Sequence, residues 1–545
     1  MAPEKDVPLL LRALAASPWA RWPAVAARQL RPYIEARERT VLSLGIQRRV
    51  RRGSGRWWGG GCGRSSLQLM LEAGPEPWLD AGATTRLRGH VEAARERTRA
   101  TGRSVLASVT VPLGQPADPA ATILASRQEH EPWFCLEQPE REGWALAGLG
   151  CAQALQASGP ERFAVVERAW RRAGALACSD APGGPPGIGL VAMGGFAFNP
   201  AGTGSPPWSG FCPASLIVPV VALARHRERT WVTLTVAVQP DDTTADAVGR
   251  AEDTLSRLRE APLPLLDPAP AAAPQVRSVM PPSHYEEAVA GAVQRIRHGE
   301  LEKVVLAREV EVSAPAGLDP GAIFGVLRQG FPSCFIYAVG RRDSTFTGAT
   351  PELLIRRQGA RASTVALAGS TRRSADPAVD AHLGERLLGS TKDREENAIV
   401  ARRIARALRP YSVWVAAAPD PVVVKVANIQ HLAAPIRAQL TGPVGAVELA
   451  GSLHPTPAVG GEPWSVAEPL IPALEGFDRG WYAGPVGWTD ASGDGEFCVA
   501  LRCGLLRGTS ARLFAGAGIV RDSEPAAELA ETEVKLQALL PLVAS

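Results

Sequence analysis

The order of strand-like and helix-like segments constrains the fold of this chain most. Short runs rich in β-branched residues come in mixed order with helical patterns, and they show no regular strand–helix–strand rhythm. That mixed order is typical of antiparallel sheets with helices kept apart from them. The sequence therefore predicts an α+β fold with large antiparallel β-sheets and peripheral helices.

Individual elements follow from local pattern. Strands are expected at Ser104–Pro112, Gly194–Pro200, Ala214–Ala224, Thr230–Val238 and Glu496–Leu506, and a strand followed by a turn at Phe514–Asp522. Helices are expected at Pro160–Ala175, Lys392–Leu408 and Ala526–Leu540. A further helix should run to about His298 from Ser283, which with Glu286 forms a capping-box pattern.

Length and charge divide the chain. At 545 residues it exceeds one ordinary core. Residues 1–65 carry thirteen Lys and Arg but four Asp and Glu, which predicts a basic, poorly ordered extension over 1–80 with one helix near Pro23–Arg39. A folded half is expected over 86–261, a Pro/Ala-rich linker over 262–282 and a second, catalytic half over 283–543.

Composition argues against several classes of protein. With 59 basic and 55 acidic residues, the charge is too balanced for a nucleic-acid binder. No run approaches the ~18–20 apolar residues of a membrane span, and no signal peptide is visible. The eight cysteines show neither CxxC nor zinc spacing. We therefore expect a cytoplasmic protein, with organellar targeting by the basic extension as the less favoured alternative.

Two acidic pairs could build a cation site. Asp393 and Glu396 lie three residues apart on one expected helix, and Glu528 and Glu531 do so on another. Such pairs are usually solvated surface, but two of them could form an all-oxygen site for Mg²⁺.

Other charged residues interrupt apolar segments. Lys303 lies at the edge of a β-branched run, Glu352 begins the apolar segment PELLI, and Arg502 interrupts an expected strand. Burial lowers the pKa of a lysine and raises that of a glutamate, which suits them to act as base and acid. Gly516 and Gly518 would let backbone N–H groups approach an anionic ligand.

Taken together, these segments resemble the chorismate-utilising enzymes, which include isochorismate synthase, salicylate synthase, anthranilate synthase component I and aminodeoxychorismate synthase component I. The resemblance implies the anthranilate synthase component I-like fold, and it continues weakly upstream through 100–113, 131–141 and 194–200. The segments that carry it are KVVLAR (303–308), GATPELL (348–354), ALAGSTRR (366–373), STKDREEN (390–397), IQHL (429–432), HPTPAVGG (454–461), RGWYAGPVGW (479–488), GEFCVALR (495–502) and AGAGIVRDSEPAAELAETEVK (515–535).

Three positions favour the branch that uses water. Members that use ammonia resemble one another in having Gln where this chain has Lys303. Aminodeoxychorismate synthases commonly carry a lysine where it has Ala368, and the ammonia users often continue with LVDLxRND where it has IVARRIARA. HPTPAVGG resembles isochorismate synthases, whereas salicylate synthases tend to have Thr in place of Ala458; KDREEN and EFCVALRCGLL look like the menaquinone-type enzymes.

The resemblance implies a role for each site residue. Lys303 would be the general base that activates water, and Glu352 the general acid that protonates the leaving hydroxyl. Glu396 and Glu531 would bind Mg²⁺ directly, with Asp393 and Glu528 holding metal-bound waters. The residues implied in binding the substrate are Arg502, Tyr482, Gly516, Gly518, His431, Lys535, Gly369 and Ser370.

The function implied is that of an Mg²⁺-dependent isochorismate synthase that acts on chorismate, with no glutamine amidotransferase subunit, nucleic acid or membrane span. One alternative is a salicylate synthase, which makes isochorismate and then eliminates pyruvate. A second is an inactive chorismate-binding subunit.

Overall fold

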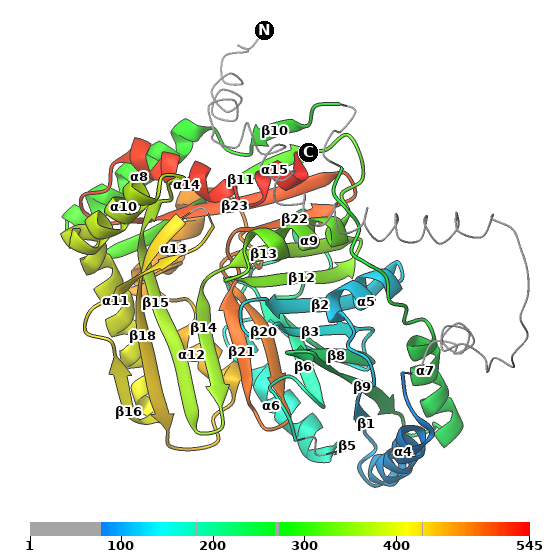
Figure 1. The fold of residues 1–545 in the computed structure, drawn as a ribbon. Coiled ribbons are helices and arrows are strands. Elements are labelled where there is room, and N and C mark those ends of the chain that lie inside the picture. Colours follow the sequence, from blue (N-terminus) through cyan, green and yellow to red (C-terminus); the bar gives the residue numbers. More distant parts are fainter. Residues whose placement is uncertain (1–77, 181–182, 268–271, 428, 545) are drawn as a thin grey trace, which may run out of the picture. The chain divides into compact units, whose positions relative to one another are not determined.

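The computed structural model describes residues 78–180, 183–267, 272–427 and 429–544. The helix predicted over Pro23–Arg39, and nearly all of the predicted basic extension, lie outside these residues. The described residues belong to one compact unit, Pro77–Ser545, which is built on two large β-sheets (Figure 1). The predicted α+β class with large antiparallel sheets is confirmed.

The larger sheet has thirteen strands. Most neighbouring strands run antiparallel, and their residues are buried almost continuously because both faces of the sheet are covered. In spatial order its strands are β10 (Gln275–Ser278), β11 (Lys303–Ser313), β23 (Ser510–Ile519), β22 (Cys503–Arg507), β13 (Ser344–Thr350), β12 (Phe335–Arg342), β2 (His130–Gln138), β3 (Trp144–Leu149), β8 (Val221–His226), β9 (Arg229–Val238), β1 (Val105–Pro112) and β5 (Cys178–Ser179), with β19 (Gly461–Glu462) also paired to β11.

The second sheet has ten strands and is antiparallel in the same way. Its spatial order is β16 (Ser412–Ala417), β18 (Ile429–Leu440), β15 (Arg361–Arg372), β14 (Leu353–Gln358), β21 (Gly495–Val499), β20 (Pro485–Asp490), β6 (Val191–Phe196), β7 (Ala214–Val218) and β4 (Gln153–Ala157), with β17 (Val422–Lys425) also paired to β18.

Helices pack around these sheets. They are α4 (Ala81–Thr101), α5 (Pro119–Ser126), α6 (Arg162–Leu176), α7 (Thr244–Ser256), α8 (Pro282–Arg297), α9 (Pro320–Gly330), α10 (Pro377–Gly389), α11 (Thr391–Leu408), α12 (Ala446–Leu453), α13 (Trp464–Glu475), α14 (Pro525–Leu536) and α15 (Leu540–Val543), with the 3₁₀ turns η2 (Pro206–Trp208) and η3 (Arg409–Tyr411). None of the helices in the described ranges combines the length and apolarity needed to cross a membrane.

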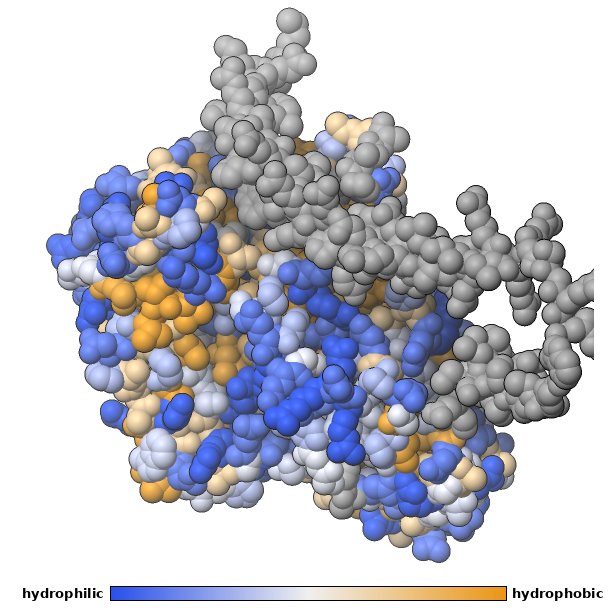
Figure 2. All heavy atoms as spheres, in the orientation of Figure 1, coloured by the Kyte–Doolittle hydropathy of each residue, from blue (hydrophilic) through white to orange (hydrophobic). Residues whose placement is uncertain are grey.

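Two hydrophobic cores hold the layers together. One contains residues of both sheets, such as Leu306 and Ile436, and therefore lies between them. The other packs the larger sheet against α4, α7 and α9 through residues such as Val91 and Ile323. Apolar side chains also reach the surface at the end of the ten-stranded sheet, where Trp414 of β16 is 50% exposed; Figure 2 shows apolar surface on the side where Figure 1 places β16, β18 and α11.

The two halves of the chain on either side of the proline-rich segment share both sheets. β2 of the first half pairs with β12 of the second in one sheet, and β6 pairs with β20 in the other. β10 lies inside the predicted linker and pairs with β11. The predicted segments 86–261 and 283–543 therefore build one unit in common.

Two predicted strands are wrong because the chain changes sheets within them. The stretch Ala214–Ala224 divides at Pro219 into β7 of one sheet and β8 of the other. The stretch Glu496–Leu506 divides in the same way into β21 and β22, and Arg502 at the division has the left-handed φ of 49°. Glu352 lies at a third such crossing, between β13 and β14. Chains that turn the corner between packed sheets need such bends.

Three smaller predictions also need correction. The capping box at Ser283 is absent, because α8 already begins at Pro282 and no side chain caps it. The last predicted helix ends at Leu536, and α15 follows as a separate turn. The strand predicted over Gly194–Pro200 begins and ends earlier, at Val191–Phe196. The other predicted strands and helices of the described residues are present within a few residues of the expected ends.

Candidate active site

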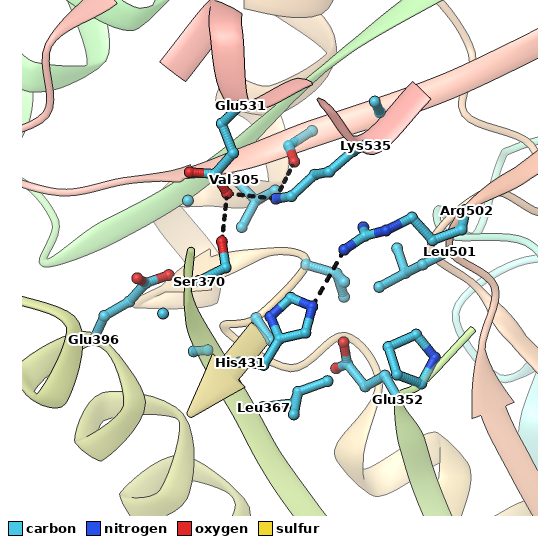
Figure 3. Close-up of a pocket in the computed structure, with 18 of the residues that line it drawn as sticks. Val305, Glu352, Leu367, Ser370, Glu396, His431, Leu501, Arg502, Glu531 and Lys535 are labelled. Carbon is cyan, nitrogen blue, oxygen red and sulfur yellow. Dashed lines mark hydrogen bonds and ion pairs between the residues drawn. The ribbon is translucent and has the colours of Figure 1, made fainter. Parts of the chain in front are cut away.

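A pocket lies beside α11 and α14, at the crossings between the two sheets (Figure 3). The empty space in and before it amounts to about 820 Å³, open solvent included. Thirteen of the fourteen predicted site residues line it: Glu352, Gly369, Ser370, Asp393, Glu396, His431, Tyr482, Arg502, Gly516, Gly518, Glu528, Glu531 and Lys535.

The first turns of α11 bring one acidic pair to the pocket. The helix begins after Ser390, whose hydroxyl accepts a hydrogen bond from the backbone N–H of Asp393 at 3.2 Å. Glu396 follows three residues later on the same face. A bulge in β15 gives Gly369 a φ of 78°, and a Cβ there would lie 2.9 Å from the Cβ of Asp393. Glycine therefore lets β15 approach this helix closely.

The second acidic pair lies on α14. Glu531 forms an ion pair with Lys535 at 2.7 Å and accepts a hydrogen bond from the Ser370 hydroxyl at 3.0 Å (Figure 3). Burial opposes ionisation of Glu531, but Lys535 and Ser370 outweigh it and lower its pKa to about 2. Lys535 also donates to the carbonyl of Gly516 at 2.8 Å. Glu528 contacts Lys392 at 3.4 Å.

The four carboxylates affect one another. Burial raises the pKa of Asp393, and Glu396 adds to the rise. Burial and Glu531 likewise raise the pKa of Glu528. Such a set of oxygen donors has the chemistry of a site for a hard divalent cation. Within the described residues, however, no three His, Cys, Asp or Glu side chains converge closely enough to hold a metal ion as they stand.

Lys303 is the one predicted site residue that does not line the pocket. It is fully buried behind the wall, and its Nζ donates to Oε1 of Glu396 at 2.8 Å. Glu396 and Gly518 both line the pocket in front of the lysine, and a Cβ on Gly518 would lie 2.6 Å from that oxygen and 2.9 Å from Cε of Lys303. The amine therefore contacts a pocket residue, Glu396, and Gly518, which has no side chain, lies between the amine and the pocket.

Glu352 lies on a different side of the pocket from Glu396 (Figure 3). It is 5% exposed and is held at the crossing between β13 and β14. Burial raises the pKa of its carboxyl to about 7, although the positive charges of Lys303 and Arg502 oppose the rise. The group can therefore carry a proton near neutral pH, as a general acid must.

Arg502 and His431 lie next to Glu352 in the pocket (Figure 3). Nη2 of Arg502 lies 3.2 Å from Nε2 of His431. Burial and the charge of Arg502 lower the pKa of His431 to about 3, so the ring is neutral and can accept that hydrogen bond. No carboxylate of the described residues forms an ion pair with Arg502. Its guanidinium can therefore receive an anionic ligand.

Tyr482 completes this side of the pocket. Its ring stacks on Phe514 of β23 with centroids 5.3 Å apart, and burial raises the pKa of its phenol. A Cβ on Gly516 would lie 3.0 Å from Oη of Tyr482 and 2.9 Å from the carbonyl oxygen of Leu306. The absence of a side chain at Gly516 therefore makes room for the phenol.

Lys392 is a charged residue of the pocket that no sequence motif identified. Lys392 lines the pocket mouth, contacts Glu528, and is 43% exposed. Its place directly before the acidic pair of α11 is the signal that could have identified it. His454, the first residue of the HPTPAVGG segment, lies outside the pocket. Its Nε2 is hydrogen-bonded to the carbonyl of Phe198 at 3.0 Å, and its ring packs against that of Phe163.

The arrangement can bind a small anion and exchange protons with it. Four carboxylates gather at one side, and Arg502 and Tyr482 offer hydrogen-bond donors at the other. Glu352 supplies a carboxyl that is partly protonated near neutral pH. A small anionic substrate could be held between a cation bound to the four carboxylates and the guanidinium group of Arg502.

Comparison with known proteins relates this pocket to a family. Residues 91–544 match the family model described as "Chorismate binding enzyme". The salicylate biosynthesis isochorismate synthase of Pseudomonas aeruginosa is 38% identical over 83% of this chain and 93% of its own length. The isochorismate synthase MenF of Bacillus subtilis is 32% identical over 75% of this chain and 87% of its own length.

Solved structures agree in fold. The menaquinone-specific isochorismate synthase MenF from Escherichia coli is similar over 84% of this chain and 100% of its own, with a TM-score of 0.68 and 25% identity. A putative 2,3-dihydroxybenzoate-specific isochorismate synthase, DhbC from Bacillus anthracis, covers 78% of this chain and 99% of its own, with a TM-score of 0.62 and 28% identity. Anthranilate synthase component I from Streptococcus pneumoniae, at 18% identity and a TM-score of 0.56 over 90% of this chain and 100% of its own, shares the fold.

Proposed function

The chain belongs to the family of chorismate-binding enzymes, and we infer that it is an isochorismate synthase, an isomerase that converts chorismate to isochorismate. Similarity over 83% and 75% of this chain to two proteins named as isochorismate synthases supports the inference. The observation that carries it within the structure is the buried Glu352, whose pKa of about 7 suits a proton donor, on the wall of a pocket that also holds four carboxylates.

The reaction removes the hydroxyl group at C4 of the ring and places a new one at C2. The oxygen of a water molecule forms a bond to C2, the ring double bonds shift, and the C4–O bond breaks. Water is a poor nucleophile and hydroxide a poor leaving group, so one group must remove a proton from the attacking water and another must protonate the departing oxygen. Each transfer contributes about 10²–10⁴ in rate.

Lys303 is the proposed base and Glu352 the proposed acid. Glu352 can donate its proton directly, because it lines the pocket. Lys303 donates to Glu396 in this structure, so its amine must leave that contact and give up a proton before it can act as a base. Its approach to substrate leads past Gly518, which has no side chain to block it. A deprotonated amine with access to the pocket is the requirement for the base.

Mg²⁺ is the proposed cofactor. When bound, it would supply positive charge to hold a substrate carboxylate and draw electron density from the ring. Glu396 and Glu531 are the proposed direct ligands, and Asp393 and Glu528 the proposed holders of metal-bound water. Burial and, to a lesser extent, the neighbouring carboxylates raise the pKa values of Asp393 and Glu528, and a bound cation would relieve that repulsion between like charges.

The remaining pocket residues would orient the substrate. Arg502 and Tyr482 are proposed to bind the enolpyruvyl carboxylate, with backbone N–H groups of Gly516 and Gly518 beside them. The neutral ring of His431 would lie near the reacting side of the substrate. Lys535 is proposed to lie near the metal-bound carboxylate, close to Gly369 and Ser370.

Water as the nucleophile needs no source of ammonia, so we propose that the chain acts without a glutamine amidotransferase subunit. A cytoplasmic location stays a prediction.

Product analysis tests the proposed function. The full chain is incubated with chorismate and Mg²⁺, with and without ammonium, and the products are separated by chromatography. We expect isochorismate in both cases. Salicylate with an equal amount of pyruvate would identify a salicylate synthase, and ammonium-dependent anthranilate would place the chain in the other branch. Chorismate binding without any turnover would identify an inactive binding subunit.

A further inference from the structure

A buried ion pair lies directly behind the pocket wall, outside the machinery described so far. It joins Arg479 to Glu475 at the end of α13, and their side chains are 2% and 1% exposed. Nε of Arg479 donates to Oε2 of Glu475 at 2.9 Å, and Nη2 donates to the other carboxylate oxygen. A buried ion pair often stabilises a fold no more than apolar residues of the same volume would. Its other contacts therefore indicate what the pair does.

The pair fills a gap along one edge of β11. On this edge β19 pairs with Lys303 and Val304, and β10 pairs with β11 from Val310 onward. Between them, the carbonyl of Val305 accepts a hydrogen bond from Nη2 of Arg479 at 2.9 Å, and the N–H of Ala307 donates to Oε1 of Glu475 at 2.7 Å. One acceptor and one donor two residues apart are what a neighbouring strand would satisfy. The two side chains therefore take the place of a strand.

The same guanidinium contacts two other parts of the pocket wall. Its Nη1 donates to the carbonyl of Val459 at 2.8 Å, in the loop after α12. Its Cζ lies 5.7 Å from the ring centroid of Tyr482 and 4.2 Å from that of Phe198, within the range of cation–π contacts. Val305, Val459 and Tyr482 all line the pocket. One side chain thus joins three walls that are far apart in sequence.

A second arginine, which is half-buried, provides a contrast within the same molecule. Arg328 of α9 forms ion pairs with Asp118 at 2.6 Å and Glu137 at 2.7 Å, and its side chain is 20% exposed. None of these three residues lines the pocket described above. Arg328 thus shows what a purely structural ion pair looks like in this fold.

We propose that Arg479, held by Glu475, is a positioning residue for the reaction, an inference that rests on the proposed function. It fixes the part of β11 that carries Lys303 and Val305 against Tyr482 and the loop at Val459. Displacements of about 1 Å in such walls can cost ~10²-fold in rate. The planar fork of arginine is required, because a lysine ammonium cannot serve two carbonyls and both carboxylate oxygens in the same geometry.

The test compares two conservative variants. Arg479→Lys should lower kcat/KM for chorismate by about tenfold or more, while Arg328→Lys should stay within about twofold of the unchanged protein. Both are assayed well below their unfolding midpoints, which are measured by circular dichroism. A folded Arg479→Lys variant with kcat/KM within twofold of the unchanged protein would overturn the proposal.

A double-mutant cycle separates positioning from general destabilisation. Tyr482→Phe removes the hydroxyl group and keeps the aromatic ring. If Arg479 positions the hydroxyl group of Tyr482, Tyr482→Phe should lower kcat/KM less in the Arg479→Lys variant than in the unchanged protein. In the Arg328→Lys variant, Tyr482→Phe should lower kcat/KM as much as it does in the unchanged protein. Equal costs in both backgrounds would contradict a positioning role.

Two further measurements apply if the Arg479→Lys variant does not fold or if the unchanged protein makes no isochorismate. If Arg479→Lys does not fold, Glu475→Gln replaces it, because the amide cannot keep both contacts with Arg479 and that with Ala307; unchanged kcat/KM in that variant would overturn the proposal. An unchanged protein that makes no isochorismate would refute the proposed function instead. In that case, chorismate affinity measured by tryptophan fluorescence would still test Arg479, and equal affinity of the Arg479→Lys variant would refute its role.

Discussion

Nζ of Lys303 and Oε1 of Glu396 lie 2.8 Å apart, in an ion pair between a buried lysine and a carboxylate of the pocket wall. The pair joins β11 to α11, so the strand and the helix that carry the two groups are held together. Glu396 is also a proposed metal ligand. A bound cation and the lysine would therefore share one carboxylate, which links the proposed base directly to the proposed metal site.

The first prediction concerns the base. Lys303→Met removes the amine and keeps most of the apolar stem, and it should reduce turnover of chorismate by at least about a hundredfold. The measurement is isochorismate formed per minute, by chromatography. Lys425→Met is the control, since Lys425 pairs with Asp380 away from the pocket and should leave turnover nearly unchanged. Near-normal activity of the Lys303 variant would remove it from the role of base.

The second prediction concerns the pH dependence of the reaction. Because burial raises the pKa of Glu352 to about 7, the protonated acid is abundant below that pH and is lost above it. The rate should therefore fall on the alkaline side with a midpoint near 7. The measurement is kcat/KM between pH 5.5 and 9, because kcat/KM reports the groups of the free enzyme. Glu352→Gln should lower kcat by about 10²-fold or more, and an alkaline limb that persists in the residual activity of that variant would assign the midpoint to another group.

The third prediction concerns stability at the same residue. The pKa of Glu352 is about 7 in the fold against an ordinary value of 4.5. Between these two pH values the unfolded chain loses its proton first, so the folded state becomes less stable as pH rises, by about 3 kcal/mol in total. The Glu352→Gln variant has no carboxyl group at this position, so it should not show this decrease in stability with rising pH. The difference in free energy of unfolding between variant and unchanged protein, measured with denaturant at pH 4.5 and 8, should therefore shift in favour of the variant; no shift would show that the carboxyl is not buried as described.

The fourth prediction concerns the metal. Glu531→Gln removes a charge from the acidic side of the pocket and should raise the Mg²⁺ concentration needed for half-maximal rate at least about tenfold, or abolish activity. Glu533→Gln on the same helix is the matched control, because Glu533 does not line the pocket. The measurement is a magnesium titration of initial rates. The same half-maximal concentration in both variants would exclude Glu531 as a ligand.

The fifth prediction concerns the glycine between Lys303 and the pocket. Gly518→Ala would place a Cβ 2.6 Å from Oε1 of Glu396, closer than such contacts allow. It should separate the ion pair and lower kcat/KM by about tenfold or more. Gly442→Ala has nothing within 4 Å of the added carbon and should change neither activity nor stability. Equal activity of the two variants would show that the approach past Gly518 is not used.

Motif reading could identify most of the site but not its layout. The glycines and carboxylates of 515–535 and 390–397 could be recognised together because each set is contiguous, and local helical spacing places the carboxylates of a set on one face. The bends at Pro219 and Arg502 could not be predicted, because β-branched runs look the same whether they stay in one sheet or cross to another. Lys303 appeared as a pocket residue in sequence, whereas the structure places it behind Glu396.

The sequence alone determined the class of fold, the family and the residue types of the site, since periodicity and contiguous motifs are local properties of the chain. Only the tertiary structure decided which groups meet. Arg479 and Glu475 replace a strand beside β11, and Glu352 is buried enough to hold a proton near pH 7. Both results depend on neighbours that are distant in sequence, because burial and the satisfaction of backbone hydrogen bonds are set by the packing of the whole fold.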